Sequence, residues 1–462
     1  MASITFLGAT GTVTGSKYCL HHADSRILID CGLFQGLKEL RLRNWADMGS
    51  LARELDAIVL THAHIDHTGY LPRLVRQGFN KPVFCTEATR DLLEIMLLDS
   101  AHLQEEDAKY ANKKGFSKHR PALPLYTIED AQKAISLLRG LPYGQEFEAA
   151  AGIRAHFLDA GHILGSAFVS AEWQEGSETR SILFSGDLGR PDRPILKNPA
   201  KVKDADYLLI ESTYGDRLHP EGDPKTEIKR IILETVQRRG VIVIPAFAVG
   251  RTQELLYRLR ELEDEKAIPV MPVYVDSPMA IKATTVYEKH PQVYDREATR
   301  LSEKGIEVMQ TTQTIFTPGV EESKRINEQD QPCIIISASG MLTGGRILHH
   351  LARRLPQKKN SIVFVGYQAE GTRGRALQEG KREIKIHGMQ VRSAAHIETI
   401  SDFSAHADYR EILNWLGNFE KAPRRTFIVH GEPQASENLE KNIKEGLGWE
   451  TYIPQYKEEI QL

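Results

Sequence analysis

The chain has 462 residues, of which 41 % are hydrophobic and 26 % charged, and its formal net charge is −3. Composition and length are typical of a globular protein with two or three domains. The balanced charge excludes a protein that binds nucleic acid through overall positive charge, so any surface for a polyanion must be local. No apolar stretch of 18 residues occurs, which excludes a membrane-spanning helix.

The N-terminus and the cysteines predict a cytoplasmic protein. Residues 1–8 lack a basic leader and begin directly with a strand pattern, which is not the pattern of a signal peptide. The four cysteines are scattered and form no C-x-x-C pair, so we expect free thiols rather than disulfides.

The N-terminal part of the chain predicts a mixture of strands and helices. Thr127 and Asp130 have the spacing of a capping box at the start of a helix. This mixture is typical of two stacked sheets with helices outside. The predicted elements are strands near 3–8, 16–21, 26–31, 56–61, 82–85, 153–158, 167–173, 181–185 and 206–211, and helices near 87–98 and 128–138.

After residue 215 continuous apolar strands alternate with helices. Such a pattern predicts a parallel sheet that is covered on both faces. In sheets of this kind, ligands bind at the carboxyl ends of the strands. The predicted elements are helices near 225–239 and 251–263 and strands near 241–245, 270–276, 333–337 and 361–365.

Three histidines and one aspartate lie within six residues, His62-Ala63-His64-Ile65-Asp66-His67, between a predicted strand and a predicted helix. Imidazole and carboxylate are the ligands of catalytic zinc. Four such groups exceed the needs of one open catalytic ion, so they predict two ions, with His62 and His64 on one and Asp66 and His67 on the other. A turn of solvated histidines is the alternative, which the spacing and the flanking elements disfavour.

Three further ligand-type residues each follow an apolar run. His162, Asp187 and His430 are flanked by glycines, which allow the backbone to turn tightly. Each of these segments alone is more typical of an ordinary turn. Together with the histidine run they predict a metal centre at converging strand ends.

These motifs resemble those of a known family. The run from His62 to His67, together with His162, Asp187 and Asp30, resembles the metal motifs of the metallo-β-lactamase fold. Glu211, His406 and His430 resemble the three motifs of its β-CASP branch of nucleases. The resemblance covers nearly the whole chain and is strongest to short prokaryotic RNA-processing members, which are similar to the eukaryotic pre-mRNA 3′-end cleavage endonuclease.

The resemblance implies an α/β metallo-β-lactamase αββα sandwich with an inserted β-CASP domain. Asp187 and His430 should share one metal site although an entire α/β domain fits between them in the sequence. We therefore expect residues 1–211 to form the first part of the metallo-β-lactamase domain, 212–395 the inserted domain, and 396–462 the completing part.

The expected metal centre contains two zinc ions that activate a shared water as a hydroxide nucleophile. Asp187 is best placed to bridge the ions, Asp66 could also orient the nucleophile, and Asp30 is expected to fix a ligand histidine through its free N–H. The predicted ligands are His62, His64, Asp66, His67, His162, Asp187 and His430.

His406 is not needed as a ligand, so it is expected to be the general acid that protonates the leaving oxygen. Glu211 is the expected partner that holds His406 protonated. The resemblance implies the same pair.

Two glycine-rich turns follow predicted strands of the central part, at residues 337–346 and 366–375. Exposed amides at the start of a helix could hold a phosphate, although ordinary surface turns are equally compatible with the pattern. A local excess of basic residues accompanies the second turn and extends to Lys381, Arg382 and Lys385. The candidate phosphate-binding residues are Ser337, Ser339, Gly340, Met341, Gly344, Gly345, Arg373 and Arg375.

The sequence therefore predicts a zinc-dependent ribonuclease that acts on single-stranded RNA. Alternatives are a hydrolase of a small molecule such as a thioester, a nuclease acting on DNA, and a binding subunit without activity. The DNA-repair members of the branch have valine at the third motif, where this chain has His430. A homodimer, other RNA-processing partners, and endonucleolytic or exonucleolytic cleavage are left open.

Overall fold

The computed structural model describes residues 2–115, 119–220, 222–366, 368, 371–400 and 403–462. The chain divides into two compact units. The first contains Met1–Arg193, Lys197–Leu218 and His406–Leu462, and the second contains Pro194–Leu196 and His219–Ala405. Apart from Pro194–Leu196, the second unit runs from His219 to Ala405, compared with the edges near 212 and 395 that the sequence analysis expects. Residues 396–399, expected in the completing part, instead form a strand of the second unit's sheet.

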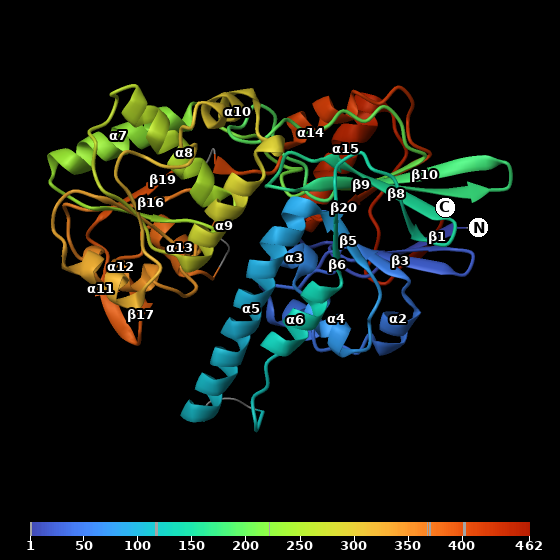
Figure 1. Cartoon of the computed structure of the whole chain (residues 1–462), viewed down its shortest axis with the longest axis horizontal. Helices are drawn as coiled ribbons and strands as arrows, with labels where there is room; N and C mark the ends of the chain where they lie inside the picture. The colour runs from blue at the N-terminus through green and yellow to red at the C-terminus, as the bar shows by residue number, and fades with distance from the viewer. Residues whose placement is uncertain (1, 116–118, 221, 367, 369–370, 401–402) are drawn as a thin grey trace. The chain divides into compact units, whose positions relative to one another are not determined.

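Two seven-stranded sheets form the centre of the first unit (Figure 1). The first sheet contains, in spatial order, β22 (Glu459–Gln461), β1 (Ala2–Phe6), β2 (Tyr18–His22), β3 (Ser25–Ile29), β4 (Ala57–Val59), β5 (Val83–Thr86) and β6 (Leu138–Leu141). The second contains β21 (Thr451–Tyr452), β20 (Arg425–Val429), β11 (Tyr207–Glu211), β10 (Glu178–Phe184), β9 (Ala167–Glu175), β8 (Ile153–Asp159) and β7 (Phe147–Ala150). The pairing of β1 with β22 brings the two chain ends together.

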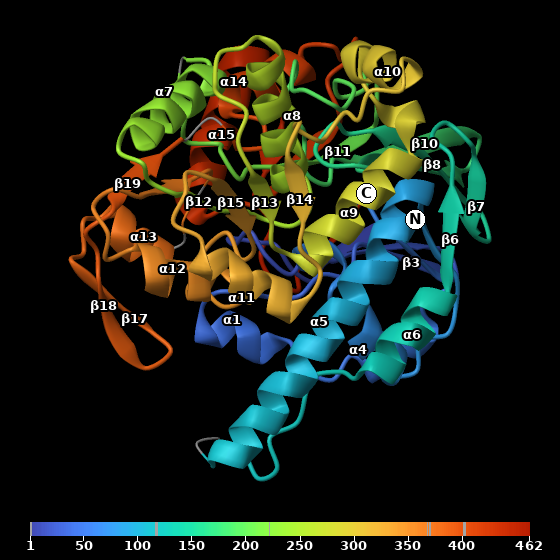
Figure 2. The same cartoon turned by 60° about the vertical axis from the view of Figure 1, so that its left-hand side comes forward.

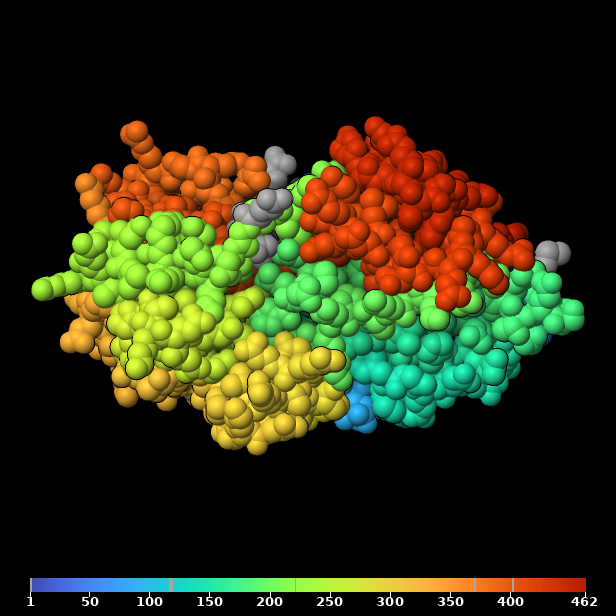
Figure 3. All heavy atoms as spheres, turned by 90° about the horizontal axis from the view of Figure 1, so that it is seen from above, coloured from blue at the N-terminus to red at the C-terminus, as the bar shows by residue number. Residues whose placement is uncertain are grey.

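The facing sides of the two sheets bury one apolar core, to which Ile4, Ile29, Phe157, Phe184 and Phe427 contribute. A second core lies on the outer face of the second sheet, where α14 (Tyr409–Leu416) and α15 (Pro433–Leu447) cover it. Figure 3 shows the atoms of this C-terminal segment, in red, next to green atoms of the same unit. The predicted sandwich of two sheets with helices outside is confirmed.

The helices of the first unit are α1 (Lys38–Arg43), α2 (Gly49–Glu54), α3 (Ile65–Thr68), α4 (Leu71–Arg76), α5 (Glu87–Lys114), α6 (Ile128–Ser136), α14 (Tyr409–Leu416) and α15 (Pro433–Leu447). The capping box predicted at Thr127 and Asp130 is present at the start of α6. No helix among the residues described here is long and apolar enough to cross a membrane.

The helix predicted over 87–98 is much longer, because α5 continues to Lys114 (Figure 2). Its second half has few apolar residues, so the amphipathic pattern ends before the helix does. Hydrogen bonds from the returning segment stabilise it there: Asn112 and Ala122 exchange two, of 2.9 and 2.7 Å, and the Leu125 amide donates to Gln104.

The second unit contains a six-stranded sheet in which every strand pair is parallel, as predicted. Its spatial order is β14 (Thr314–Phe316), β13 (Val273–Val275), β15 (Ile334–Ser337), β12 (Ile242–Pro245), β16 (Ser361–Phe364) and β19 (His396–Thr399). β17 (Glu383–Ile386) and β18 (Met389–Arg392) form a separate hairpin. The helices are α7 (Pro224–Gln237), α8 (Arg251–Asp264), α9 (Pro278–Lys289), the 3-10 helix η1 (Pro291–Val293), α10 (Arg296–Glu303), α11 (Val320–Glu328), α12 (Ile347–Arg354) and α13 (Arg373–Gln378).

Candidate metal centre

The predicted ligands lie at strand ends of the first unit. The histidine run follows β4 and leads into α3, while His162, Asp187 and His430 follow β8, β10 and β20. His430 has a left-handed backbone with φ of 52°, a conformation that a non-glycine residue adopts rarely. Although the ligands are far apart in the sequence, the two sheets bring all seven side chains together.

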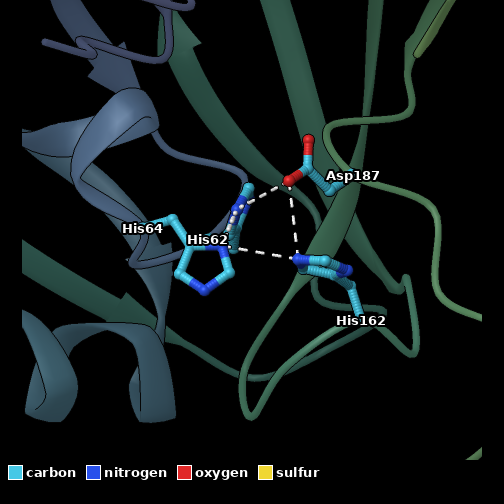
Figure 4. Close-up of side chains that lie close together, drawn as sticks. All are labelled: His62, His64, His162 and Asp187. Atoms are coloured by element: carbon cyan, nitrogen blue, oxygen red, sulfur yellow. Dashed lines mark hydrogen bonds and ion pairs between the residues drawn. The ribbon is translucent and has the colours of Figure 1, made fainter. Parts of the chain in front are cut away.

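The first ligand group contains His62, His64, His162 and Asp187, whose donor atoms all lie within 4.8 Å of one another (Figure 4). His62 Nε2 is 3.1 Å from His64 Nδ1 and 3.4 Å from Asp187 Oδ2. His162 Nε2 is 3.4 Å from both His64 Nδ1 and Asp187 Oδ2. These four side chains face one another in the way that ligands surround a single ion.

The second ligand group contains Asp66, His67 and His430. His67 Nε2 is 3.1 Å from His430 Nε2, and His430 Nε2 is 3.4 Å from Asp66 Oδ2. Asp187 reaches this group as well, because its Oδ1 is 3.1 Å from His67 Nε2. The two oxygens of Asp187 therefore face different ligand groups.

The donor atoms have the spacing and chemistry that a divalent cation requires. Nitrogen ligands about 2.0–2.1 Å from a tetrahedral zinc ion are about 3.3 Å apart, close to the separations in both groups. Asp187 Oδ1 and His162 Nδ1 are buried and have no hydrogen-bond partner among the described residues. A buried carboxylate oxygen without a hydrogen bond is costly unless it coordinates an ion. The residues present thus fit a divalent metal centre.

Burial favours the metal-binding form of the histidines in the first group. It lowers the pKa of His64 to about 3, with a further contribution from His62, and it lowers the pKa of His62 and His162 as well. A neutral imidazole keeps a nitrogen lone pair for coordination.

Asp30, expected to fix a ligand histidine, contacts His67 directly and reaches His62 through the Thr61 hydroxyl. Its Oδ2 is 2.7 Å from His67 Nδ1, and its carboxylate accepts a hydrogen bond from the Thr61 hydroxyl. The Thr61 oxygen is in turn 3.0 Å from His62 Nδ1. Because the hydroxyl hydrogen goes to Asp30, the Thr61 oxygen accepts from His62 Nδ1–H, so both histidines direct Nε2 to the centre.

Thr61 and Thr213 are the functional candidates that sequence reasoning missed. The Thr213 hydroxyl lies 3.2 Å from both His430 Nδ1 and the His430 carbonyl oxygen. Donation to the carbonyl leaves the Thr213 oxygen to accept from Nδ1–H, which directs Nε2 of His430 to the second group. The only signal in the sequence is a hydroxyl residue beside a motif residue, and such residues are common.

His406 and Glu211 lie beside the first group. His406 Nδ1 is 3.1 and 3.3 Å from the two carboxylate oxygens of Glu211, which also accepts a hydrogen bond of 2.6 Å from the Leu188 amide. Burial lowers the pKa of His406, but the negative charges of Glu211 and Asp187 outweigh burial and raise it to about 9. The protonated form is therefore favoured at neutral pH.

The candidate phosphate-binding turn at 337–346 lies in the second unit, between β15 and α12. Its carbonyl oxygens accept hydrogen bonds from Arg373, which donates to Leu342 and Thr343 and also to Lys385. Arg375 is paired with Glu379 at 2.6 Å. Both arginines thus have protein partners in this structure. Residues 367, 369 and 370 of the other candidate turn lie outside the described residues.

Comparisons with known proteins agree with this architecture. Residues 13–269 match the metallo-beta-lactamase superfamily, residues 252–377 the Beta-Casp domain, and residues 390–454 the Zn-dependent metallo-hydrolase RNA specificity domain. A crystal structure of an Enterococcus faecalis protein of unknown function aligns over 100 % of both chains with a TM-score of 0.56 and 14 % identity, which shows a shared fold.

Two curated relatives cover most of the chain. Ribonuclease TTHA0252 of Thermus thermophilus is 37 % identical over 92 % of this chain and 92 % of its own length. The transcription termination factor FttA of Methanocaldococcus jannaschii is 31 % identical over 99 % of this chain and 71 % of its own length. With the metal motifs converging on one site, the chain belongs to the metallo-β-lactamase superfamily and to its β-CASP branch.

Proposed function

We propose that the protein is a two-zinc ribonuclease that hydrolyses phosphodiester bonds of single-stranded RNA. The observation that carries this proposal is Asp187, whose two oxygens face separate ligand groups while the His406–Glu211 pair lies beside them. The similarity to a ribonuclease and to a transcription termination factor supports RNA as the substrate.

The side chains divide the chemistry among them. Bound zinc ions would lower the pKa of a coordinated water and stabilise charge on the phosphate. Asp66 orients the attacking water, and Asp187 keeps the two ligand groups at a fixed separation. His406 gives its proton to the leaving oxygen, and Glu211 keeps His406 charged and oriented until it does so.

The turn at 337–346 is proposed to hold an RNA phosphate through backbone amides. The amides of Gly340, Met341, Gly344 and Gly345 make no hydrogen bond to another described residue. Arg373 donates hydrogen bonds to the carbonyl oxygens of Leu342 and Thr343 in the same turn. Amides without partners attract anions, so we assign Arg373 to holding the turn rather than to binding phosphate directly.

We also propose that the protein acts in the cytoplasm. All four cysteines are free and buried, as expected for a protein folded under reducing conditions.

The test is cleavage of single-stranded RNA labelled at either end, compared with single-stranded DNA and with a thioester substrate. The zinc-loaded enzyme should cut RNA, and Asp187→Ala should lose both activity and bound metal. Blocking either RNA end separates endonucleolytic from exonucleolytic cleavage. Efficient thioester hydrolysis without RNA cleavage would make the protein a small-molecule hydrolase instead.

A further inference from the structure

Lys17, directly before β2, is a buried lysine of the first unit. Its side chain is 2 % exposed, and its ammonium group donates to the carbonyl oxygens of Gly15, at 3.2 Å, and Gly32, at 2.5 Å. Nζ also lies 4.5 Å from the ring centre of Phe34 and 4.9 Å from that of Tyr70. Among the described residues, its hydrogen-bond partners are these backbone carbonyl groups and no carboxylate pairs with it.

A buried ammonium without a carboxylate is expensive. Burial lowers the pKa of Lys17 to about 8, even though the neighbouring Cys31 acts in the opposite direction. A methionine of similar length would fill the space without this cost, because it carries no charge to desolvate. The buried ammonium group should therefore have a role other than packing.

The two carbonyl groups belong to two loops that hold the start of α3. In the loop at 15–17, the Ser16 amide donates to Asp66 O at 2.9 Å. In the loop at 31–34, the Cys31 amide donates to His67 O at 2.7 Å, and the Leu33 amide to Ile65 O at 3.0 Å. The Gly32 amide joins the loops to each other by donating to Ser16 O at 2.9 Å. The Lys17 ammonium group joins the same two loops through its hydrogen bonds to Gly15 O and Gly32 O.

Close packing allows little movement in this arrangement. A Cβ atom on Gly32 would lie 1.5 Å from Asp66 O, and one on Gly15 would lie 2.4 Å from the Phe34 ring. Both glycines are therefore required by space, and Gly15 also by its φ of 79°. A shift of either loop would therefore also shift the backbone of Asp66 and His67, which these loops contact.

We propose that Lys17 is a positioning residue for the second ligand group. Its ammonium group ties the two loops together, and the loops fix the backbone from which Asp66 and His67 reach the metal. The inference rests on the two-ion function proposed above. Among the described residues, the backbone hydrogen bonds from these loops to the histidine run reach residues 65–67 and not His62 or His64, so the first ligand group should not depend on Lys17.

The test is metal titration of full-length Lys17→Met, followed by calorimetry and by cobalt(II) absorption. Binding at the first ligand group should be as in the wild type, while the affinity at the second ligand group should fall by about 10- to 100-fold, the usual effect of losing support for a ligand. Lys457→Met is the matched control, because it removes another lysine whose Nζ lies near a ring, 5.5 Å from that of Tyr456, at an exposed position. It should leave both affinities unchanged.

A second variant decides the question if Lys17→Met does not fold. Phe34→Leu removes one ring beside the ammonium group and keeps both carbonyl contacts. It should therefore lower the metal affinity of the second ligand group alone, by several-fold. Unchanged affinity for the second ion in the variant that folds, or equal loss of both ions, would overturn the inference. The wild-type titration tests the two-ion function separately, since a protein that binds one ion fails there before any variant is compared.

Discussion

One carboxylate serves both ligand groups. Asp30 contacts His67 of the second group directly and reaches His62 of the first through the Thr61 hydroxyl. The orientation of both imidazoles therefore depends on a residue that need not touch a metal ion. Support of this kind commonly controls metal affinity as strongly as the ligands themselves.

Thr61→Val should change the metal affinity of the first ligand group without changing that of the second. Valine keeps the shape of threonine but removes the hydroxyl that accepts from His62, whereas the contact between Asp30 and His67 remains. Metal titration should show that affinity at the first ligand group falls by about 10- to 100-fold and that affinity at the second ligand group is unchanged. Asp30→Asn should weaken both. Wild-type binding by Thr61→Val would show that the hydroxyl relay has no role.

His406→Ala should keep both ions and still bind RNA, yet cleave it about 10²- to 10⁴-fold more slowly, because the leaving oxygen loses its proton donor. A substrate with sulfur as the leaving atom needs little protonation, so it should restore cleavage by this variant. His430→Ala is the contrast: it should lose metal and not be rescued. Loss of zinc by His406→Ala would make His406 a ligand instead.

Asp159, at the end of β8, predicts a pH dependence of stability. Burial raises its pKa to about 6, against the opposing effects of the Gly161 amide and Lys197. Since the folded state holds the proton more tightly, this group's stabilisation is present below pH about 4 and is lost as the pH rises through about 6.

Asp159→Asn has no titrating carboxyl group at this position, so it should not lose stability there as the pH rises. Relative to wild type, its free energy of unfolding should increase by on the order of 2 kcal/mol between pH 4 and pH 7. Denaturant unfolding at both pH values measures the difference. A difference that does not change with pH would mean that Asp159 titrates normally in the folded protein.

At the scale of elements, the sequence predicted those helices and strands that have a clear apolar periodicity or a capping motif. The capping box of α6 and the buried strands β3, β10 and β12 follow from local pattern. β6 and β7 were missed because they are only partly buried and neither forms a continuous apolar run, and β6 also contains a glycine. The second half of α5 was missed because a partner segment, rather than an apolar face, stabilises it.

The same limit applies to the metal centre. The side chains that carry ligand chemistry were recognisable in the sequence, and the structure brings them together. The residues that fix their orientation act through single hydroxyl groups or through loop backbone, as Thr61, Thr213 and Lys17 do. No local pattern distinguishes such residues from ordinary ones, because their roles depend on contacts between distant segments.

The β17–β18 hairpin and the segment before it carry the exposed basic residues Lys381, Arg382 and Lys385. Reversing these three charges should weaken RNA binding and flatten its dependence on salt, because fewer counterions are then released. Filter binding at several salt concentrations measures both quantities. Charge reversal of Lys441 and Lys444 on α15 is the control. An unchanged salt slope would mean that this stretch is simply solvated surface.

At the scale of the whole molecule, the first unit is assembled from separate segments of the chain. Asp187 precedes the residues of the second unit, and His406 and His430 follow them. The strand that carries His430 at its end, β20, pairs in parallel with β11, whose last residue is Glu211. The predicted insertion is therefore also the reason why motif residues stand so far apart in the sequence.

This parallel pair has a consequence during synthesis. A ribosome releases β11 long before β20, and until β20 arrives β11 has an unpaired edge and the proposed centre lacks both His430 and His406, the proposed general acid. Contacts between such distant segments form slowly. A nascent chain surrounded by RNA thus carries an incomplete centre, and the capacity to cut appears only when the last segment docks.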